Sequence, residues 1–195
     1  MKVRVGVIGL QGDVSEHVKA MESALGEKGS VVLIRRAGII PDCDGLVLPG
    51  GESTTLSRQL TATGIDREIA QASDAGIPVL ATCAGLVLVS GQIEGNGKVQ
   101  RLGLMDTTIG RNVFGSQKES FEADLNVEGF DRPYRAVFIR APAIVSTGKA
   151  VRVLAKIGKN GVAAQQKNLL GLSFHPELTD DQRFHWYFLD MMGVT

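Results

Sequence analysis

The chain has 195 residues, of which 44% are hydrophobic and 22% charged, a composition typical of a globular protein that buries a core without disulfides or metals. Lysine plus arginine and aspartate plus glutamate number 21 each, so the net charge gives no global attraction to nucleic acid or to anionic lipid. No apolar run reaches the roughly 18 residues of a membrane span, and we expect a single cytoplasmic domain over residues 1–195 without a signal peptide or a disulfide framework.

The first half of the chain alternates strand-like and helix-like segments. Residues 2–10 are β-branched and apolar, which predicts a buried strand, and the spacing of apolar residues over 14–25 predicts a helix with Asp13 available as its cap. This alternation predicts a three-layer, flavodoxin-like α/β fold, with a mostly parallel sheet and helices on both faces. Further strands are expected at 31–35, 44–48 and 79–82, with a second helix from Ser53–Thr54 onward.

The second half is richer in strand-like sequence and predicts extra antiparallel strands. Residues 151–157 and 162–166 flank Lys159-Asn160-Gly161, and Asn-Gly is a strong signal for a hairpin turn. Another buried strand, 169–174, ends in His175-Pro176-Glu177. The last helix is expected to open with a capping box at Thr179-Asp180-Asp181-Gln182.

The segment Ala81-Thr82-Cys83-Ala84-Gly85 places a cysteine where a strand turns sharply into a helix. Small residues suit the tight turn of a nucleophile elbow, and the helix amino terminus favours a thiolate over a thiol. The alternative is a cysteine that packs in the core as a small hydrophobe, which is the commoner role of a buried cysteine. Ligands bind at the carboxyl ends of strands in such sheets, so the position also fits a site.

Two further motifs supply the groups that a nucleophilic cysteine needs. In an extended His175-Pro176-Glu177 segment the imidazole and the carboxylate project from the same face, so Glu177 can fix one tautomer of His175. Gly50-Gly51 precedes a helix and can point backbone N–H groups at a developing oxyanion, together with the N–H of Ala84. The alternatives are a surface His-Pro-Glu turn and a phosphate loop, although the Walker and GxGxxG spacings are absent.

The order of these motifs resembles that of a class I (triad) glutamine amidotransferase. The likeness is greatest to the branch that serves pyridoxal 5′-phosphate synthesis, and it runs essentially from end to end of the chain. It rests on Leu10-Gln11-Gly12 with Glu16-His17, PGGEST, TCAGL, Phe138-Ile139-Arg140-Ala141-Pro142 and FHPEL.

This resemblance implies a glutaminase whose nucleophile is Cys83, whose base is His175 and whose orienting carboxylate is Glu177. It implies no cofactor and no metal in this chain. The implied partner is the synthase subunit, a (β/α)8 barrel protein in a large hetero-oligomer, with Gln11 and His17 near the interface. The implied oxyanion hole is Gly51 with Ala84, and the implied glutamine contacts are Gly51, Glu52, Ser53, Arg111, Ile139 and Arg140.

One position departs from the family pattern, and other functions remain to be weighed. Ala81 stands where the family usually has glycine, which the turn tolerates unless that position needs a positive φ. Cys43 is interpreted as an incidental thiol and His185 as a packing or capping residue. The alternatives are an amidotransferase of purine, histidine or anthranilate synthesis, a non-catalytic PfpI-like regulator, and a subunit that binds its partner without hydrolysing glutamine.

Overall fold

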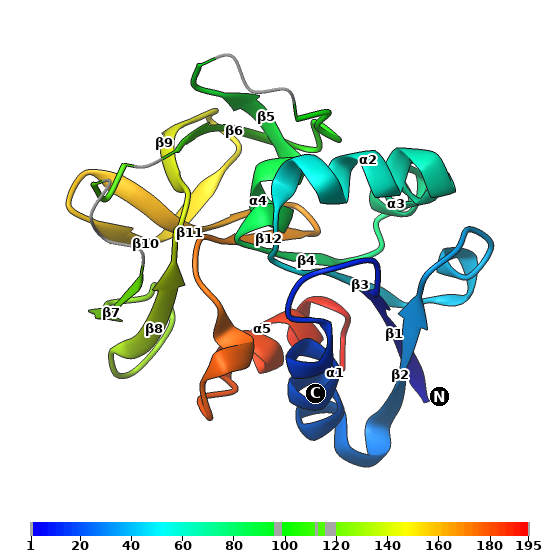
Figure 1. Cartoon of the computed structure of the whole chain (residues 1–195). Coiled ribbons are helices and arrows are strands. Elements are labelled where there is room, and N and C mark those ends of the chain that lie inside the picture. Colours follow the sequence, from blue (N-terminus) through cyan, green and yellow to red (C-terminus); the bar gives the residue numbers. More distant parts are fainter. Residues whose placement is uncertain (1, 96–98, 112, 116–119, 195) are drawn as a thin grey trace.

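The computed structural model describes residues 2–95, 99–111, 113–115 and 120–194, and its centre is one mixed sheet of ten strands (Figure 1). Five neighbouring strands run parallel in the order β2-β1-β3-β4-β12. The first four come from the first half of the chain, for which the sequence predicted a parallel sheet, and β12 comes from the second half. Three of them are buried along their whole length, which explains their uninterrupted apolar sequence. Their bounds are Val3–Ile8 (β1), Gly29–Ile34 (β2), Gly45–Leu48 (β3), Val79–Thr82 (β4) and Leu169–Leu172 (β12).

Helices cover both faces of the parallel strands and create two hydrophobic cores (Figure 1). One core lies under α1 and α5, and the other under α2, α3 and α4. Within the described residues, no helix has both the length and the apolar character needed to cross a membrane. The helices span Val14–Leu25 (α1), Ser53–Thr63 (α2), Ile65–Asp74 (α3), Ala84–Val89 (α4) and Arg183–Met191 (α5).

The second half of the chain extends the sheet with antiparallel pairs, as predicted. β11 pairs with β12, β10 and β9, and β9 pairs with β6; β5 returns parallel to β6, while β7 and β8 form a separate two-stranded sheet. The strand bounds are Ser90–Ile93 (β5), Met105–Gly110 (β6), Ser120–Leu125 (β7), Tyr134–Ile139 (β8), Ala143–Thr147 (β9), Arg152–Ile157 (β10) and Asn160–Gln166 (β11).

The hairpin between β10 and β11 exists, but its turn lies two positions earlier than the Asn160-Gly161 pair suggested. Ile157 pairs with Asn160, so the two turn residues are Gly158 and Lys159, and Asn160 already belongs to the strand. Gly158 has φ +58, the left-handed conformation that the first residue of a type II′ turn requires. The Asn-Gly pair therefore predicted the hairpin correctly and its turn residues wrongly.

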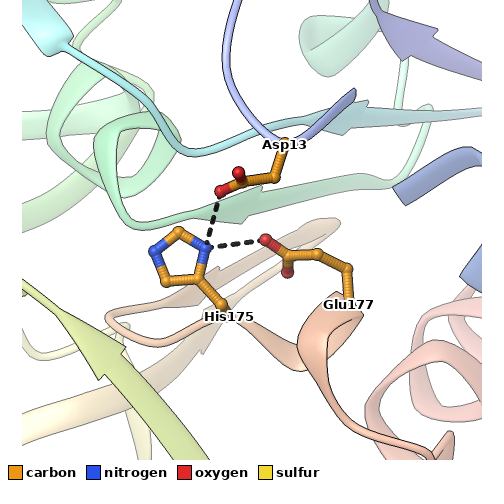
Figure 2. A group of neighbouring side chains, drawn as sticks. All are labelled: Asp13, His175 and Glu177. Carbon is orange, nitrogen blue, oxygen red and sulfur yellow. Dashed lines mark hydrogen bonds and ion pairs between the residues drawn. The ribbon is translucent and has the colours of Figure 1, made fainter. Parts of the chain in front are cut away.

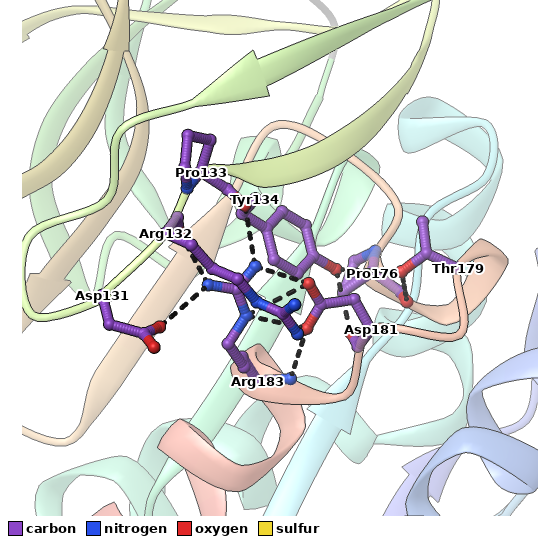
Figure 3. Close-up of polar contacts among 8 residues, drawn as sticks. All are labelled: Asp131, Arg132, Pro133, Tyr134, Pro176, Thr179, Asp181 and Arg183. Atoms are coloured by element: carbon purple, nitrogen blue, oxygen red, sulfur yellow. Dashed lines mark hydrogen bonds and ion pairs between the residues drawn. The ribbon is translucent and has the colours of Figure 1, made fainter.

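The last helix begins without the predicted capping box. Its N-cap is Gln182, which makes no side-chain cap bond. Thr179 instead meets the Tyr134 hydroxyl, with 3.1 Å between the two oxygens. Arg183 donates to the carbonyls of Arg132 at 2.7 Å and Pro133 at 2.9 Å, and its guanidinium lies 2.6 Å from Asp181 Oδ2 (Figure 3). Arg183 thus ties the start of α5 to the segment that enters β8.

Candidate active site

Cys83 occupies a strained turn between β4 and α4, as the elbow pattern predicted. Its backbone has φ 48 and ψ −104, a conformation that costs a non-glycine residue roughly 1–3 kcal/mol. Two residues later the chain passes so close to β3 that a Cβ on Gly85 would lie 2.2 Å from the carbonyl oxygen of Leu48. Only glycine fits at that position, and the close approach holds the elbow against the sheet.

Ala81, the departure from the family pattern, leaves this turn undisturbed. It lies inside β4, where it pairs with Leu48 of β3 and Gly171 of β12. Positive φ among the described non-glycine residues occurs at Cys83, Arg140 and Lys167, so Ala81 has an ordinary extended backbone. Its methyl group is buried in one of the two hydrophobic cores. The strained backbone conformation of the turn is therefore that of Cys83, and position 81 does not require a glycine.

His175 and Glu177 are in direct contact at the carboxyl end of β12. His175 Nδ1 lies 2.7 Å from Glu177 Oε1, and the two residues are 3% and 8% exposed. The segment is not extended, contrary to the sequence argument, because Pro176–Leu178 form a 3-10 turn (η3) with His175 as its N-cap. The turn brings the two side chains together, so the prediction of contact is right although its stated geometry is wrong.

The imidazole of His175 also interacts with the sulfur of Cys83. Burial acts to lower the pKa of His175, but hydrogen bonds to Cys83 and Glu177, with the negative charge of both groups, outweigh it and raise that pKa. On its other side the Cys83 sulfur lies 3.9 Å from the carbonyl oxygen of Ile139. The arrangement favours a protonated imidazole next to the sulfur of Cys83, the position from which a histidine can hold the proton of a nucleophilic thiol.

A second carboxylate approaches the same nitrogen of His175 (Figure 2). Asp13 Oδ2 lies 3.3 Å from His175 Nδ1. Asp13 is the N-cap residue of α1, as predicted, but its side chain makes no cap bond to the helix. Asp13, His175 and Glu177 offer atoms within 4.8 Å of one another, a spacing compatible with a metal ion. Both carboxylates, however, converge on one ring nitrogen, as acceptors around a protonated imidazole do.

A cavity of about 520 Å³ opens beside Cys83 and His175. Its volume lies within the range of small-molecule sites. It brings together every residue that the sequence analysis placed near the substrate. Those residues are Gly51, Glu52, Ser53, Ala84, Arg111, Ile139 and Arg140, and Gly12, Asp13, Val87, Ala141 and Pro142 complete the lining.

The carboxylate of Glu52 caps helix α2. It accepts hydrogen bonds from the backbone N–H groups of Thr54 at 3.1 Å and Thr55 at 2.7 Å. The bond to Thr55 makes the largest contribution to lowering the pKa of this carboxyl to about 2. The backbone carbonyl of Glu52 accepts from Gln11 Nε2 at 2.9 Å. Glu52 therefore fixes the loop that precedes α2, and the placement of Gln11 at a partner interface stays a prediction.

The two glycines of that loop are required by close approaches to the site. A Cβ on Gly50 would lie 2.7 Å from His175 Cε1, and Gly51 has φ +136. A Cβ on Gly12 would lie 1.9 Å from the carbonyl oxygen of Gly50. The backbone of this loop is thus packed against the imidazole on one side and the Gly12 turn on the other.

His17 is buried, a position that the sequence did not predict. Its side chain is 0% exposed, so it cannot itself contact a partner, and its placement near the partner interface stays a prediction. It points toward the site, with Nε2 3.1 Å from Thr82 Oγ1 and 3.3 Å from Glu177 Oε1. Val14, His17 and Met21 share a helical stripe at i, i+3 and i+7, a signal that could have predicted this burial.

Comparison with known proteins gives one consistent match. The model of the SNO glutamine amidotransferase family matches residues 7–194. The pyridoxal 5′-phosphate synthase subunit PdxT of Methanothrix thermoacetophila is 61% identical over 187 residues, covering 96% of this chain and 98% of the relative. The PdxT subunit of Methanocella arvoryzae is 56% identical over 193 residues, covering 97% and 98%.

Solved structures agree with the fold. A crystal structure described as a glutamine amidotransferase superposes with a TM-score of 0.90 at 41% identity, over 97% of this chain and 99% of the other. PurLQS from Thermotoga maritima superposes with a TM-score of 0.75 at 17% identity, over 97% and 99%, a likeness of fold alone.

Proposed function

The chain belongs to the SNO glutamine amidotransferase family, and from that membership we propose that it hydrolyses L-glutamine and supplies the ammonia to a synthase subunit that makes pyridoxal 5′-phosphate. The observation on which the chemistry rests is the contact of 2.7 Å between His175 Nδ1 and Glu177 Oε1, with the sulfur of Cys83 as the other partner of the imidazole. A redox or stress regulator on a related fold has no need of such an orienting carboxylate.

In the first half of the reaction Cys83 acts as the nucleophile. Its sulfur attacks the side-chain amide carbon of glutamine, and His175 holds the thiol proton. When the C–N bond breaks, His175 gives this proton to the departing nitrogen, which leaves as ammonia, and a γ-glutamyl thioester remains on Cys83. Glu177 keeps the imidazole in the tautomer that this transfer requires.

In the second half the thioester is hydrolysed. His175 takes a proton from water as the water oxygen attacks the thioester carbon. When the C–S bond breaks, glutamate is released and His175 gives the proton to the sulfur, which regenerates the thiol. Both steps place negative charge on the carbonyl oxygen. We assign the N–H groups of Gly51 and Ala84, which line the cavity beside Cys83, as the donors that stabilise this oxyanion.

The rest of the cavity suits the amino-acid end of glutamine. Arg111 and Arg140 are exposed side chains that line it, and a guanidinium can bind a carboxylate through two parallel hydrogen bonds. Arg140 has φ 42, so its position is also held in a strained backbone conformation. We assign these arginines, with Ser53 and the backbone at Glu52 and Ile139, as the glutamine contacts.

The product requires a partner close to the site. Ammonia that escapes into neutral water is protonated and loses its nucleophilicity, so a shielded path to the acceptor is needed. We propose that the partner is a synthase subunit with a (β/α)8 barrel fold in a large hetero-oligomer, and that pyridoxal phosphate is the partner's product and no cofactor of this chain. The thiols of Cys43 and Cys83 are both free, which suits a reducing compartment such as the cytoplasm.

The test is glutamate release from glutamine, measured with and without the synthase subunit. We expect activity in the complex of the wild type and none in complexes of Cys83→Ala or His175→Asn that still assemble. Cys43→Ala, which changes the other buried cysteine, is the matched control and retains activity. Wild-type activity in Cys83→Ala, or no glutamate release from an assembled wild-type complex, contradicts the proposal.

A further inference from the structure

His17 contacts both sides of the candidate site: Thr82, which precedes Cys83, and Glu177, which orients His175. The imidazole of His17 comes from α1 and lies between β4 and η3, where Nε2 is 3.1 Å from Thr82 Oγ1 and 3.3 Å from Glu177 Oε1. The side chains of His17 and Glu177 are both 0% exposed. The same carboxylate oxygen lies 2.7 Å from His175 Nδ1, so two imidazoles share Glu177 Oε1. One consequence is that both must present an N–H to it.

The chemistry of the neighbours assigns the proton on His17. A nitrogen lone pair that faced an ionised carboxylate in a dry interior would be repelled, so Nε2 must bear the hydrogen. Among the described residues, His17 Nδ1 has no hydrogen-bond partner, which leaves Nε2 as the atom through which His17 acts. His17 therefore donates to Glu177, and the Thr82 hydroxyl lies within reach of the same N–H.

The contact has an electrostatic effect on Glu177. Burial raises the pKa of this carboxyl, but the hydrogen bonds from His17 and His175 and the electrostatic interactions with both residues outweigh burial and lower the pKa to about 2. His17 is the first of the groups that lower it. The other titratable groups that face Glu177 electrostatically are Glu16 on α1, Asp13 before α1, Tyr134 on β8 and His185 on α5.

We propose that His17 is a positioning residue of the glutaminase reaction, which holds the Glu177 carboxylate through its Nε2–H and thereby fixes the orientation of His175. Thr82 directly precedes Cys83, so the chain Thr82, His17, Glu177, His175 and Cys83 closes into a ring that joins nucleophile and base. His17 does not touch the substrate cavity and acts through Glu177 alone. The proposal rests on the glutaminase function proposed above.

The test compares His17→Leu with His17→Gln in the complete complex. Leucine has no donor, whereas the glutamine amide can place an N–H near the position of Nε2–H. Loss of a hydrogen bond to a charged group corresponds to on the order of tenfold to a hundredfold, and we expect kcat of His17→Leu to fall by about that factor. Without His17, only His175 opposes the effect of burial on Glu177, so the pKa of Glu177 rises. The acidic limb of kcat/KM therefore moves to higher pH.

The control is His185→Leu. His185 is also 0% exposed, and neither of its ring nitrogens has a hydrogen-bond partner among the described residues. We expect His185→Leu to change the melting temperature without moving the acidic limb, and His17→Gln to restore the wild-type limb and much of kcat. The proposal is overturned if the acidic limb of kcat/KM in His17→Leu lies at the wild-type pH, or if it shifts equally in His185→Leu.

The proposed function fails separately from this inference. If the assembled wild type releases no glutamate, or if Cys83→Ala releases it at the wild-type rate, the glutaminase assignment is wrong. If wild type and Cys83→Ala behave as expected but the pH profiles of His17→Leu and wild type coincide, the glutaminase assignment stands and the role of His17 is wrong. If His17→Leu and His17→Gln lose kcat equally and the acidic limb of kcat/KM shifts in neither, His17 has only a packing role and the proposal is likewise wrong.

Discussion

Replacement of Gly50 by alanine tests how tightly the base is confined. The new methyl group would lie 2.7 Å from His175 Cε1 and 3.3 Å from Cys83 Cβ, whereas ordinary contact begins at 3.4 Å. The imidazole of His175 must therefore move by about 0.7 Å, because Cys83 is held in the turn between β4 and α4 and cannot move instead. A displacement of about 1 Å in a reacting group can reduce a rate about a hundredfold, so we expect kcat to fall by roughly ten- to a hundredfold.

The assay is glutamate release by the assembled complex, accompanied by thermal unfolding of the free chain. Gly9→Ala is the matched control, because its methyl group would lie 3.3 Å from the flexible side chains of Arg35 and Leu33 at the end of the neighbouring strand. We expect the control to keep wild-type kcat. If Gly50→Ala retains kcat within twofold of wild type while folding normally, His175 is not confined by this loop and the reasoning is wrong.

Three further predictions concern stability and thiol chemistry. Arg183→Lys should unfold about 1–3 kcal/mol more easily in a denaturant titration, because lysine cannot reproduce the forked contacts to Asp181 and two backbone carbonyls. Glu52→Ala should lose about 1 kcal/mol of helix capping. Since the folded pKa of Glu52 lies near 2 against an ordinary 4.5, that difference should be complete above about pH 4.5 and vanish as the pH falls toward 2 in a pH series of unfolding curves. Burial raises the pKa of Cys43, so iodoacetamide at neutral pH should label Cys83 alone, as read by peptide mass spectrometry.

The sequence predicted the parallel core of the fold because local pattern and tertiary position agree there. The buried strands β3, β4 and β12 read as uninterrupted apolar runs, and each was placed close to its observed bounds. Helix α3 was not predicted, since Gly64 ends α2 and begins α3 without a loop that would separate two helical patterns. The hairpin turn was misplaced because positive φ falls on Gly158, and the neighbouring Asn160-Gly161 carried the stronger sequence signal.

The candidate site was predicted in its residues more fully than in its geometry. The order of motifs located Cys83, His175 and Glu177, but the 3-10 turn that joins the last two cannot be read from His-Pro-Glu alone. Asp13 follows the sequence rule for a helix cap, yet tertiary contact with His175 takes its carboxylate away from α1. These misses share one cause, because each side chain has a long-range partner that a local pattern does not contain.

The position of His17 also depends on long-range contacts, but here the local sequence indicates exposure whereas the structure shows burial. A histidine beside a glutamate on a surface helix reads as exposed, and the resemblance to a family suggested an interface. The burial of His17 depends on Thr82 and Glu177, which lie far from it in the chain. A helical stripe that contains Val14, His17 and Met21 was the available signal, and the periodicity of apolar residues alone omitted the histidine.

The most direct test of the central assignment is mass spectrometry of the complex, quenched with acid during turnover of glutamine and then digested. Cys83 is assigned as the nucleophile, so the peptide that contains it should bear the added mass of one γ-glutamyl group, and the peptide that contains Cys43 should not. In His175→Asn the adduct should be absent, since the proton transfers on either side of the thioester are lost. An adduct on any other residue, or glutamate release at the full wild-type rate with no adduct on Cys83 at any quench time, would contradict the account.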